Sequence, residues 1–324
     1  MAHPKNTYSL VADIGGTNTR VALAEGRRLV DGTIRRYANT QFPGLESVLR
    51  QYIEDEGGVD PIAACIAVAG PVREGRATMT NLDWAMDKDT LARATRAETV
   101  AILNDLQAQG HALGYIDPAN IRTVLAGPDD RATAAKLVIG VGTGFNAAPV
   151  FDLDHGRVVT PSESGHANLP IRNELELRLC NYVSTAHGFP AVEDVLSGRG
   201  LERVYAFLGQ EAEDPRELAA KDIMAALDDD TDPRAVAAAQ LFTRILGTVC
   251  GNLALIQLPF GGVYLAGGVA RAFAPHLGTF GFGEAFRDKG RFAGFMGNFA
   301  VHVIEDDYAA LTGSAAHLVA LTQG

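Results

Sequence analysis

The sequence predicts an α/β protein with two similar lobes, and three observations support this fold class. The chain has 324 residues, 47% of them hydrophobic, which is enough for a large core shared between two domains or two lobes. Short apolar segments with strand character alternate with longer segments of helical periodicity. A pattern of two strands joined by a Gly/Thr turn also occurs twice.

The predicted elements follow from apolar periodicity and from the turn residues between them. Strands are predicted over residues 8–14, 19–25, 63–69, 99–103, 136–141, 146–153 and 262–266. Helices are predicted over residues 45–55, 88–95, 105–113, 173–183, 193–207, 216–227, 234–257 and 308–321. Strands interleaved with helices of this length are typical of mixed or parallel sheets.

The repeat predicts a duplicated fold with a cleft between its lobes. The first copy is YSLVADIGGTNTRVALAEG, and the second, AKLVIGVGTGFNAAPVFDL, begins at residue 135. Each copy is followed later by a lone apolar strand that ends in glycine, ACIAVAGPV after the first and GGVYLAGGVA after the second. In the helix before that second strand, Gly247 and Gly251 lie on one face, a spacing typical of close helix packing rather than of a binding site.

Charge and cysteine usage exclude several classes of protein. With 39 acidic and 28 basic residues the formal net charge is −11, which argues against nucleic acid as a partner. Cys65, Cys180 and Cys250 lie far apart in the sequence, and we interpret them as buried thiols rather than disulfides or zinc ligands. The N-terminus has no signal-peptide core, and the uncharged stretch 245–270 is cut by PFGG. We therefore expect a cytoplasmic protein that does not bind membranes.

The glycine-rich turns have two possible uses. GVGTGF at 140–145 is followed by a strand instead of the helix that a dinucleotide motif requires, and the chain has no GxxxxGK[ST] sequence. Both turns could be plain hairpin turns. Alternatively, their backbone N–H groups and the hydroxyls of Thr17 and Thr143 could hold a polyphosphate. Asp13 would then hold Mg²⁺ through water.

The two turns and five further segments, in this order, resemble the bacterial glucokinase family. The segments are ILNDLQA, SESGH, VLSGRGL, GGVYLAGG and LTGSAAHL, and the resemblance covers residues 8 to 318. It implies an ATP-dependent hexose kinase with the actin-like ATPase fold, a duplicated ribonuclease H-like fold, and a homodimer. The related ROK sugar kinases usually carry a cysteine-rich zinc motif, which this sequence lacks. The implied lobes are a smaller one, 1–108 with about 305–324, and a larger one, 109–304.

The resemblance also assigns roles to particular residues. Asn104 and Asp105 follow a strand and precede a helix, so from the sequence alone Asp105 is either a helix-capping residue or a general base. The resemblance makes Asp105 the base and Asn104 a sugar contact, and it adds Glu163 and His166 as sugar contacts. It places ATP at the two hairpin turns and at a glycine pair near the adenosine: Ala12, Asp13, Ile14, Gly15, Gly16, Thr17, Gly142, Thr143, Gly144, Gly267 and Gly268.

Departures from the family pattern leave the substrate open. Alignment by spacing places Ala186 where the family has a second sugar-binding Glu, and the adjacent His187 could partly substitute for it. Ser162 and Ser164 replace glycines beside Glu163, and Asn146 stands where the phosphate turn usually has glycine. We expect transfer of the γ-phosphoryl group of Mg-ATP to the 6-hydroxyl of glucose. The alternatives are another hexose or an amino sugar as substrate, or a catalytically silent sugar or nucleotide sensor.

Overall fold

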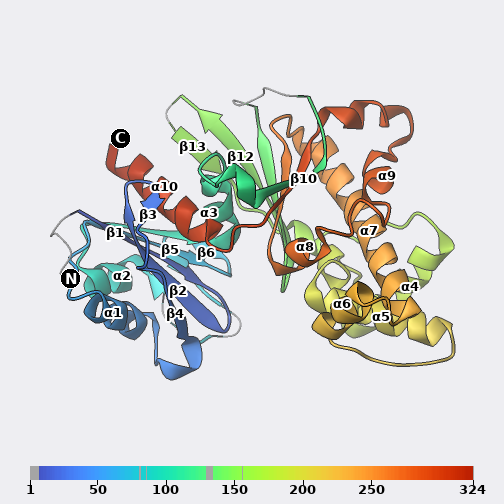
Figure 1. Ribbon diagram of the computed structural model, residues 1–324, viewed down its shortest axis with the longest axis horizontal. Helices are drawn as coiled ribbons and strands as arrows, with labels where there is room; N and C mark the ends of the chain where they lie inside the picture. The colour runs from blue at the N-terminus through green and yellow to red at the C-terminus, as the bar shows by residue number, and fades with distance from the viewer. Residues whose placement is uncertain (1–6, 80–81, 85, 129–133, 155, 324) are drawn as a thin grey trace. The chain divides into compact units, whose positions relative to one another are not determined.

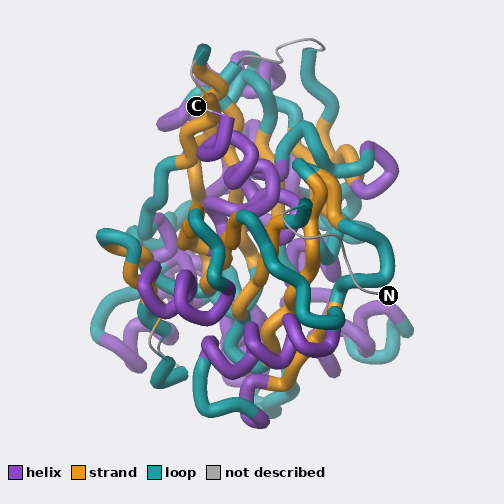
Figure 2. The backbone as a smooth tube through the Cα atoms, turned by 90° about the vertical axis from the view of Figure 1, so that its left-hand side faces the viewer, coloured by secondary structure: helices purple, strands orange, loops and turns teal. Residues whose placement is uncertain are grey.

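The structure, a computed structural model, describes residues 7–79, 82–84, 86–128, 134–154 and 156–323 (Figure 1). The chain divides into two compact units. The first unit comprises Met1–Pro118, Asp152–Pro161 and Asp306–Gly324, and the second comprises Ala119–Phe151 and Ser162–Glu305. Strands and helices alternate along the chain, with loops between them (Figure 2).

The sheet of the first unit has the order β3-β2-β1-β5-β9, and β4 also pairs with β2. β1 and β2 form an antiparallel hairpin, whereas β1, β5 and β9 run parallel to one another. Its strands are β1 (Ser9–Ile14), β2 (Asn18–Glu25), β3 (Arg28–Leu29), β4 (Arg35–Ala38), β5 (Ala63–Val68) and β9 (Thr99–Asn104). A separate small sheet consists of β6 (Val72–Arg73), β7 (Arg76–Ala77) and β8 (Met86–Asp87).

Alternate residues of β1 face two different helical layers, because successive side chains of a strand point to opposite faces of the sheet. Leu10 and Ile14 pack in the core with α1 (Leu45–Asp55) and α2 (Lys88–Thr95). Val11 packs on the other face with α10 (Ala309–Gln323). α10 also packs against α3 (Asp105–Ala112), so closely that a Cβ at Gly313 would lie 1.7 Å from the carbonyl oxygen of Ala108.

The main sheet of the second unit repeats this connectivity. Its order is β10-β15-β14-β11-β12-β13, with β11 and β12 antiparallel and β11, β14 and β15 parallel. The predicted duplication, and with it the α/β fold class, is therefore confirmed. The strands are β10 (Ile121–Leu125), β11 (Lys136–Val141), β12 (Phe145–Leu153), β13 (Gly156–Val159), β14 (Val263–Ala266) and β15 (Val301–Ile304). Of these, β13 and the last two residues of β12 are assigned to the first unit, although they belong to this sheet.

The long helix α7 (Pro233–Gln257) lies in the core of the second unit. Gly247 and Gly251 face α9 (Phe282–Arg287), and a Cβ at either position would lie 2.4 Å from a carbonyl oxygen of Phe282 or Phe286. The predicted close packing is thus confirmed. By length and composition alone α7 is the one described helix that could cross a membrane, but 67% of its most apolar window is buried inside the unit.

Two predicted helices of the second unit need correction. The segment 193–207 is not one helix: Val192–Asp194 forms the 3-10 helix η4, and α5 (Gly198–Glu211) begins after Ser197. Ser197 has extended backbone angles, and its hydroxyl accepts from the Gly200 amide at 3.0 Å, so it is the N-cap of α5. Helix 216–227 begins only at Ala220 as α6 (Ala220–Asp228), and α4 (Glu174–His187) extends past its predicted end.

The remaining differences are short elements that the sequence analysis did not predict, including β15 and α8 (Gly268–Phe273). Elements of four to six residues contain too little periodicity to stand out. The interpretation of the cysteines is confirmed, since Cys65, Cys180 and Cys250 are all buried and free. Burial raises the pKa of the Cys65 thiol to about 12, so this thiol stays protonated at neutral pH.

Candidate functional site

Predicted site residues of the first unit lie at the carboxyl ends of its parallel strands. Because β1, β5 and β9 are parallel, their carboxyl ends lie side by side, with Ile14, Val68 and Asn104 in register. Asp13 lies near the end of β1, and Asp105 is the first residue of the helix that follows β9. Ligands of α/β proteins commonly bind at such carboxyl ends.

Both Asn104 and Asp105 accept a hydrogen bond at the start of α3. Asn104 is the N-cap of α3: its side-chain oxygen accepts from the Leu106 amide at 3.0 Å. Gln107 completes the capping box by accepting from the Asn104 amide at 3.1 Å. The Asn104 side chain also donates to the carbonyl of Gly70 at 3.0 Å. The same Leu106 amide donates to Oδ1 of Asp105 at 2.8 Å, so this carboxylate shares the cap, and a second oxygen remains for other chemistry.

The charges and burial around Asp105 favour its protonated form and so raise its pKa. Burial, and next the negative charge of Asp13, raise the pKa of Asp105 to about 6. Burial also raises the pKa of Asp13, an effect opposed by Arg20, whose guanidinium lies 3.3 Å from the carboxylate. Two half-buried carboxylates, of which Asp13 disfavours the ionisation of Asp105, form a site that a bound cation would stabilise.

Hydrogen bonds from Asn39, a residue that the sequence analysis missed, hold the first glycine turn in place. Buried Asn39 donates to the carbonyl of Gly15 at 2.8 Å and accepts from the Thr19 hydroxyl at 2.8 Å. Its own amide donates to the carbonyl of Thr17. Gly16 and Thr17 remain exposed at the tip of the turn. No sequence signal links Asn39 to the turn, because the strands β2, β3 and β4 lie between them.

Two of the residues predicted to contact the nucleotide cannot do so with their side chains. The side chains of Ala12 and Ile14 are fully buried in the core beside α1 and α2. Only their backbone groups could face a nucleotide. The exposed tip of this turn therefore consists of Gly16 and Thr17, with Gly15 partly covered.

The second glycine turn lies in the second unit, against the start of α5. The Gly142 amide donates to the Gly144 carbonyl, and the Gly198 amide donates to the Gly142 carbonyl, each at 2.9 Å. Gly267 has a φ of 101°, and a Cβ there would lie 2.5 Å from the Val141 carbonyl oxygen, so only glycine fits. By contrast, a Cβ on Gly142 or on Gly268 would meet nothing within 4 Å. Open space beside bare backbone gives a ligand room to approach.

Glu163 and His166 lie on a loop that packs directly on β12. Both side chains are exposed, and His166 ends the 3-10 helix η3 (Ser164–His166). Between them, a Cβ on Gly165 would lie 2.0 Å from the Phe145 carbonyl oxygen. The loop continues against η4, where the Val192 amide donates to the Ala167 carbonyl at 2.9 Å. The structure thus fixes the backbone that carries both predicted sugar contacts.

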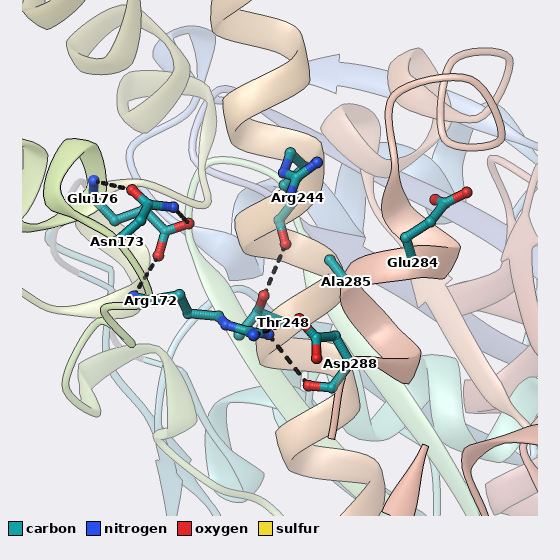
Figure 3. Close-up of a pocket in the computed structure, with 8 residues that line it drawn as sticks. All are labelled: Arg172, Asn173, Glu176, Arg244, Thr248, Glu284, Ala285 and Asp288. Atoms are coloured by element: carbon teal, nitrogen blue, oxygen red, sulfur yellow. Dashed lines mark hydrogen bonds and ion pairs between the residues drawn. The ribbon is translucent and has the colours of Figure 1, made fainter. Parts of the chain in front are cut away.

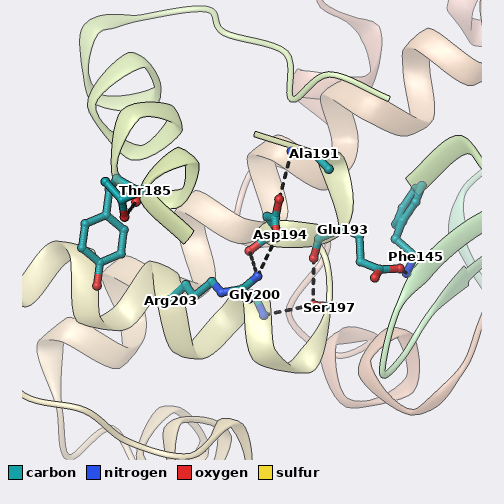
Figure 4. A network of polar contacts seen from close by, with 9 residues as sticks. Phe145, Thr185, Ala191, Glu193, Asp194, Ser197, Gly200 and Arg203 are labelled. Carbon is teal, nitrogen blue, oxygen red and sulfur yellow. Dashed lines mark hydrogen bonds and ion pairs between the residues drawn. The ribbon is translucent and has the colours of Figure 1, made fainter. Parts of the chain in front are cut away.

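A second missed residue, Glu193, brings another carboxylate to this loop. Its Oε2 accepts from the Phe145 amide at 2.9 Å, and a Cβ on Gly144 would lie 2.4 Å from the same oxygen. Figure 4 shows Glu193 extending toward Phe145, while the adjacent Asp194 instead pairs with Arg203 at 2.9 Å. The sequence contained a signal for this residue, because Glu193 stands two residues before the segment VLSG.

Other predictions are not tested by this geometry. The side chains of His187 and Ala186 lie outside the described residues. Among the described residues, no group of three or more His, Cys, Asp or Glu side chains could hold a metal ion. A cavity of about 370 Å³ in the second unit lies between the start of α4 and helices α7 and α9, and no predicted site residue lines it (Figure 3).

Comparison with known proteins gives consistent matches over nearly the whole chain. The sequence model of the Glucokinase family matches residues 10–321. A glucokinase from Saccharophagus degradans is 34% identical over 313 residues, which cover 95% of this chain and 97% of that protein.

Solved structures give the same result. A glucokinase from an Antarctic psychrotroph has a TM-score of 0.85 and 29% identity, covering 97% of this chain and 99% of that chain. A ROK family glucokinase from Streptomyces griseus, in complex with glucose and AMPPNP, has a TM-score of 0.64 and 22% identity. The alignment covers 98% of this chain and 100% of that chain, and at this identity it supports the fold alone.

Proposed function

Because the chain belongs to the glucokinase family, we propose that it transfers the γ-phosphoryl group of ATP to the 6-hydroxyl of glucose, giving glucose 6-phosphate. The observation that carries this proposal is the half-buried Asp105 at the start of α3, beside Asp13 and the capping residue Asn104. The relative from Saccharophagus degradans, 34% identical, is named a glucokinase, which supports glucose as the acceptor.

Asp105 is the proposed general base. It accepts the proton of the sugar hydroxyl as that oxygen attacks phosphorus. A pKa of about 6 suits this role, because the carboxylate is ionised at neutral pH yet still basic enough to take a proton. Asn104 is the proposed neighbouring sugar contact. Its amide group has two N–H donors, of which one is used on Gly70, so the second can bind a sugar hydroxyl.

The two glycine turns are the proposed phosphate contacts. Backbone N–H groups of Gly16 and Thr17 in the first unit, and of Thr143 and Gly144 in the second, can approach phosphate oxygens because the turns carry little side-chain bulk. Asp13 is the proposed ligand of Mg²⁺ through water, and its repulsion with Asp105 fits a cation at this place. Mg²⁺, when bound, neutralises phosphate oxygens. The open space at Gly268 fits the proposed adenosine contact, and the Gly267 backbone borders it.

The sugar contacts of the second unit are the proposed roles of Glu163, His166 and Glu193. Carboxylates accept hydrogen bonds from sugar hydroxyls, and the imidazole can donate or accept. Glu193 lies against the same loop as Glu163, so we propose that it supplies the second carboxylate that the alignment by spacing sought at position 186. A contact from His187 stays a prediction.

The proposed mechanism needs both units, since the base lies on the first and Glu163 and His166 on the second. We propose that the two lobes close over the substrates and exclude water, because water in the site would accept the phosphoryl group instead. A cytoplasmic homodimer with no nucleic-acid or membrane partner is proposed on the family resemblance and the acidic charge. Light scattering coupled to size-exclusion chromatography tests the dimer.

The substrate is tested by measuring ADP release from Mg-ATP with glucose, mannose, fructose, glucosamine and N-acetylglucosamine. We expect the highest kcat/KM with glucose. A clear preference for another sugar would overturn glucose as the substrate and keep the phosphoryl transfer. Binding of a sugar without any ADP release would overturn the kinase proposal and favour a sensor.

A further inference from the structure

Asn146 is half-buried and makes several hydrogen bonds that the proposed mechanism does not use. It is the second residue of β12, directly after Phe145, and its side chain faces the loop that precedes η3. Its partners on that loop are Ser162, Glu163 and Ser164. A single carboxamide on a strand therefore contacts three consecutive residues of the loop that carries Glu163.

The contacts enclose the backbone of Glu163 from both sides. The Asn146 Nδ2 group donates to the Ser162 carbonyl oxygen, which precedes Glu163. The Asn146 Oδ1 atom accepts from the Ser164 amide at 3.0 Å and from the Ser164 hydroxyl at 3.1 Å, which follow it. Nδ2 also lies 3.5 Å from the Glu163 carboxylate. The Ser162 hydroxyl donates to the Ala147 carbonyl at 2.7 Å and ties the loop to β12 a second time.

Contacts fix the backbone of Glu163 on both sides. Its angles are φ −125° and ψ 46°. On its C-terminal side, Gly165 packs directly on the Phe145 carbonyl, and on both of its flanks the fixing groups belong to Asn146.

We propose that Asn146 is a positioning residue for Glu163: it holds the backbone of the sugar-binding loop, and so sets the direction in which the Glu163 carboxylate meets the sugar. This inference rests on the proposed function, in which Glu163 contacts the sugar. In this proposal Asn146 acts through the loop and not by its own contact with the substrates. Ser162 and Ser164 form hydrogen bonds with its carboxamide, so the three residues act together.

The orientation of the carboxamide makes the inference specific. Its oxygen faces N–H and O–H donors of Ser164, and its nitrogen faces the carbonyl of Ser162 and the carboxylate of Glu163. An aspartate has the same shape, but Asn146→Asp replaces the donor with an oxygen. That oxygen would face a carbonyl and a second carboxylate, so the loop and the Glu163 side chain would move away.

The experiment measures the Kd of glucose by isothermal titration calorimetry, without ATP, for the full-length wild type and its variants. We expect Asn146→Ala to raise the Kd about tenfold, because it removes two hydrogen bonds to partly buried backbone groups on either side of Glu163. Asn146→Asp should raise it further, and Ser164→Ala, which keeps the amide donor, should raise it less. In kinetics the KM for glucose should rise while kcat and the KM for ATP change by less than about twofold.

Asn298→Ala is the matched control. Asn298 also donates from its carboxamide to a backbone carbonyl of the second unit, that of Phe295 at 2.8 Å, but it lies outside the proposed sugar loop. We expect this variant to leave the Kd of glucose unchanged. If Asn146 acted only on overall stability, both variants would lower the melting temperature and neither would change the Kd.

A double-mutant cycle tests whether Asn146 acts through Glu163. We expect Glu163→Gln to weaken glucose binding, and Asn146→Ala to have little further effect in that background. Additive effects would overturn the inference, as would an unchanged Kd in Asn146→Asp with the wild type binding glucose normally. A wild type that binds glucose without turnover would contradict the proposed kinase function but leave this test intact. A wild type that binds no hexose would overturn both.

Discussion

Arg157 is expected to stabilise α3, the helix that carries Asp105, from its opposite end. Its guanidinium donates to the carbonyl oxygens of Gly110 at 3.3 Å and His111 at 3.1 Å, and also to that of Leu113. It pairs with Asp152 through two contacts of 2.6 and 3.2 Å. A positive charge at the last carbonyls of a helix complements the helix dipole. We predict that Arg157→Ala loosens α3.

The size of the effect follows from the burial of the pair. The side chains of Arg157 and Asp152 are 16% and 27% exposed. Hydrogen bonds to charged groups contribute about 1.5–3 kcal/mol, of which partial exposure removes a share. The charge at the helix end adds about 0.3–1 kcal/mol. The expected loss is about 2–3 kcal/mol, which corresponds to an equilibrium constant for the opening of α3 that is about 30- to 150-fold larger.

The assay is hydrogen–deuterium exchange, read by mass spectrometry on peptides that cover α3 and, as an internal reference, α7. We expect amides of α3 to exchange faster in Arg157→Ala, with α7 unchanged. The matched control is Arg122→Ala, because Arg122 pairs with Glu305 at 2.7 Å but is 48% exposed. Loss of that pair should lower the free energy of unfolding by less than about 1 kcal/mol. Unchanged exchange of α3 in Arg157→Ala would refute the reasoning.

Four further predictions concern Asp105, the phosphate turn and the packing of α3. Since the pKa of Asp105 is raised to about 6, kcat/KM for glucose should fall as the pH drops below about 6, and a flat pH–rate profile would contradict this. The same raised pKa destabilises the native state above pH 6, so Asp105→Asn should stabilise it there by about 3 kcal/mol. In urea titrations this gain should vanish as the pH falls from 6 toward 4. Gly142→Ala should fold normally but raise the KM for ATP about tenfold, whereas Gly278→Ala, also with open space at its Cβ, should not. Gly313→Ala should lower the melting temperature strongly, because its Cβ would overlap the Ala108 carbonyl.

Much of the fold could be predicted because its larger elements carry strong local signals. The two hairpins and the strands after them are apolar runs bounded by glycine, and the duplication appears directly in the sequence. Helices such as α1 and α2 begin and end at their predicted residues. Short elements such as β15 and α8 depend on the sheet they join, and the break at Ser197 is a single capping interaction within an otherwise helical pattern.

The residues of the site could be predicted where they belong to a motif, but their supports could not. Asp105 and Asn104 follow a predicted strand and precede a predicted helix, and the structure places them at the end of β9 and the start of α3. Asn39 lies far along the chain from the turn it holds, so only the folded chain brings them together. Asn146 appeared in the sequence as a departure from glycine, and its hydrogen bonds became visible only with the loop in place.

The measurement that tests the account most directly compares glucose-dependent ADP release by the wild type and by Asp105→Asn, with glucose binding measured in parallel. We predict that the wild type turns over with glucose, and that Asp105→Asn loses at least about 100-fold in kcat while it still binds glucose. If Asp105→Asn turned over glucose at the wild-type rate, Asp105 would not be the base, and the proposed mechanism would be wrong.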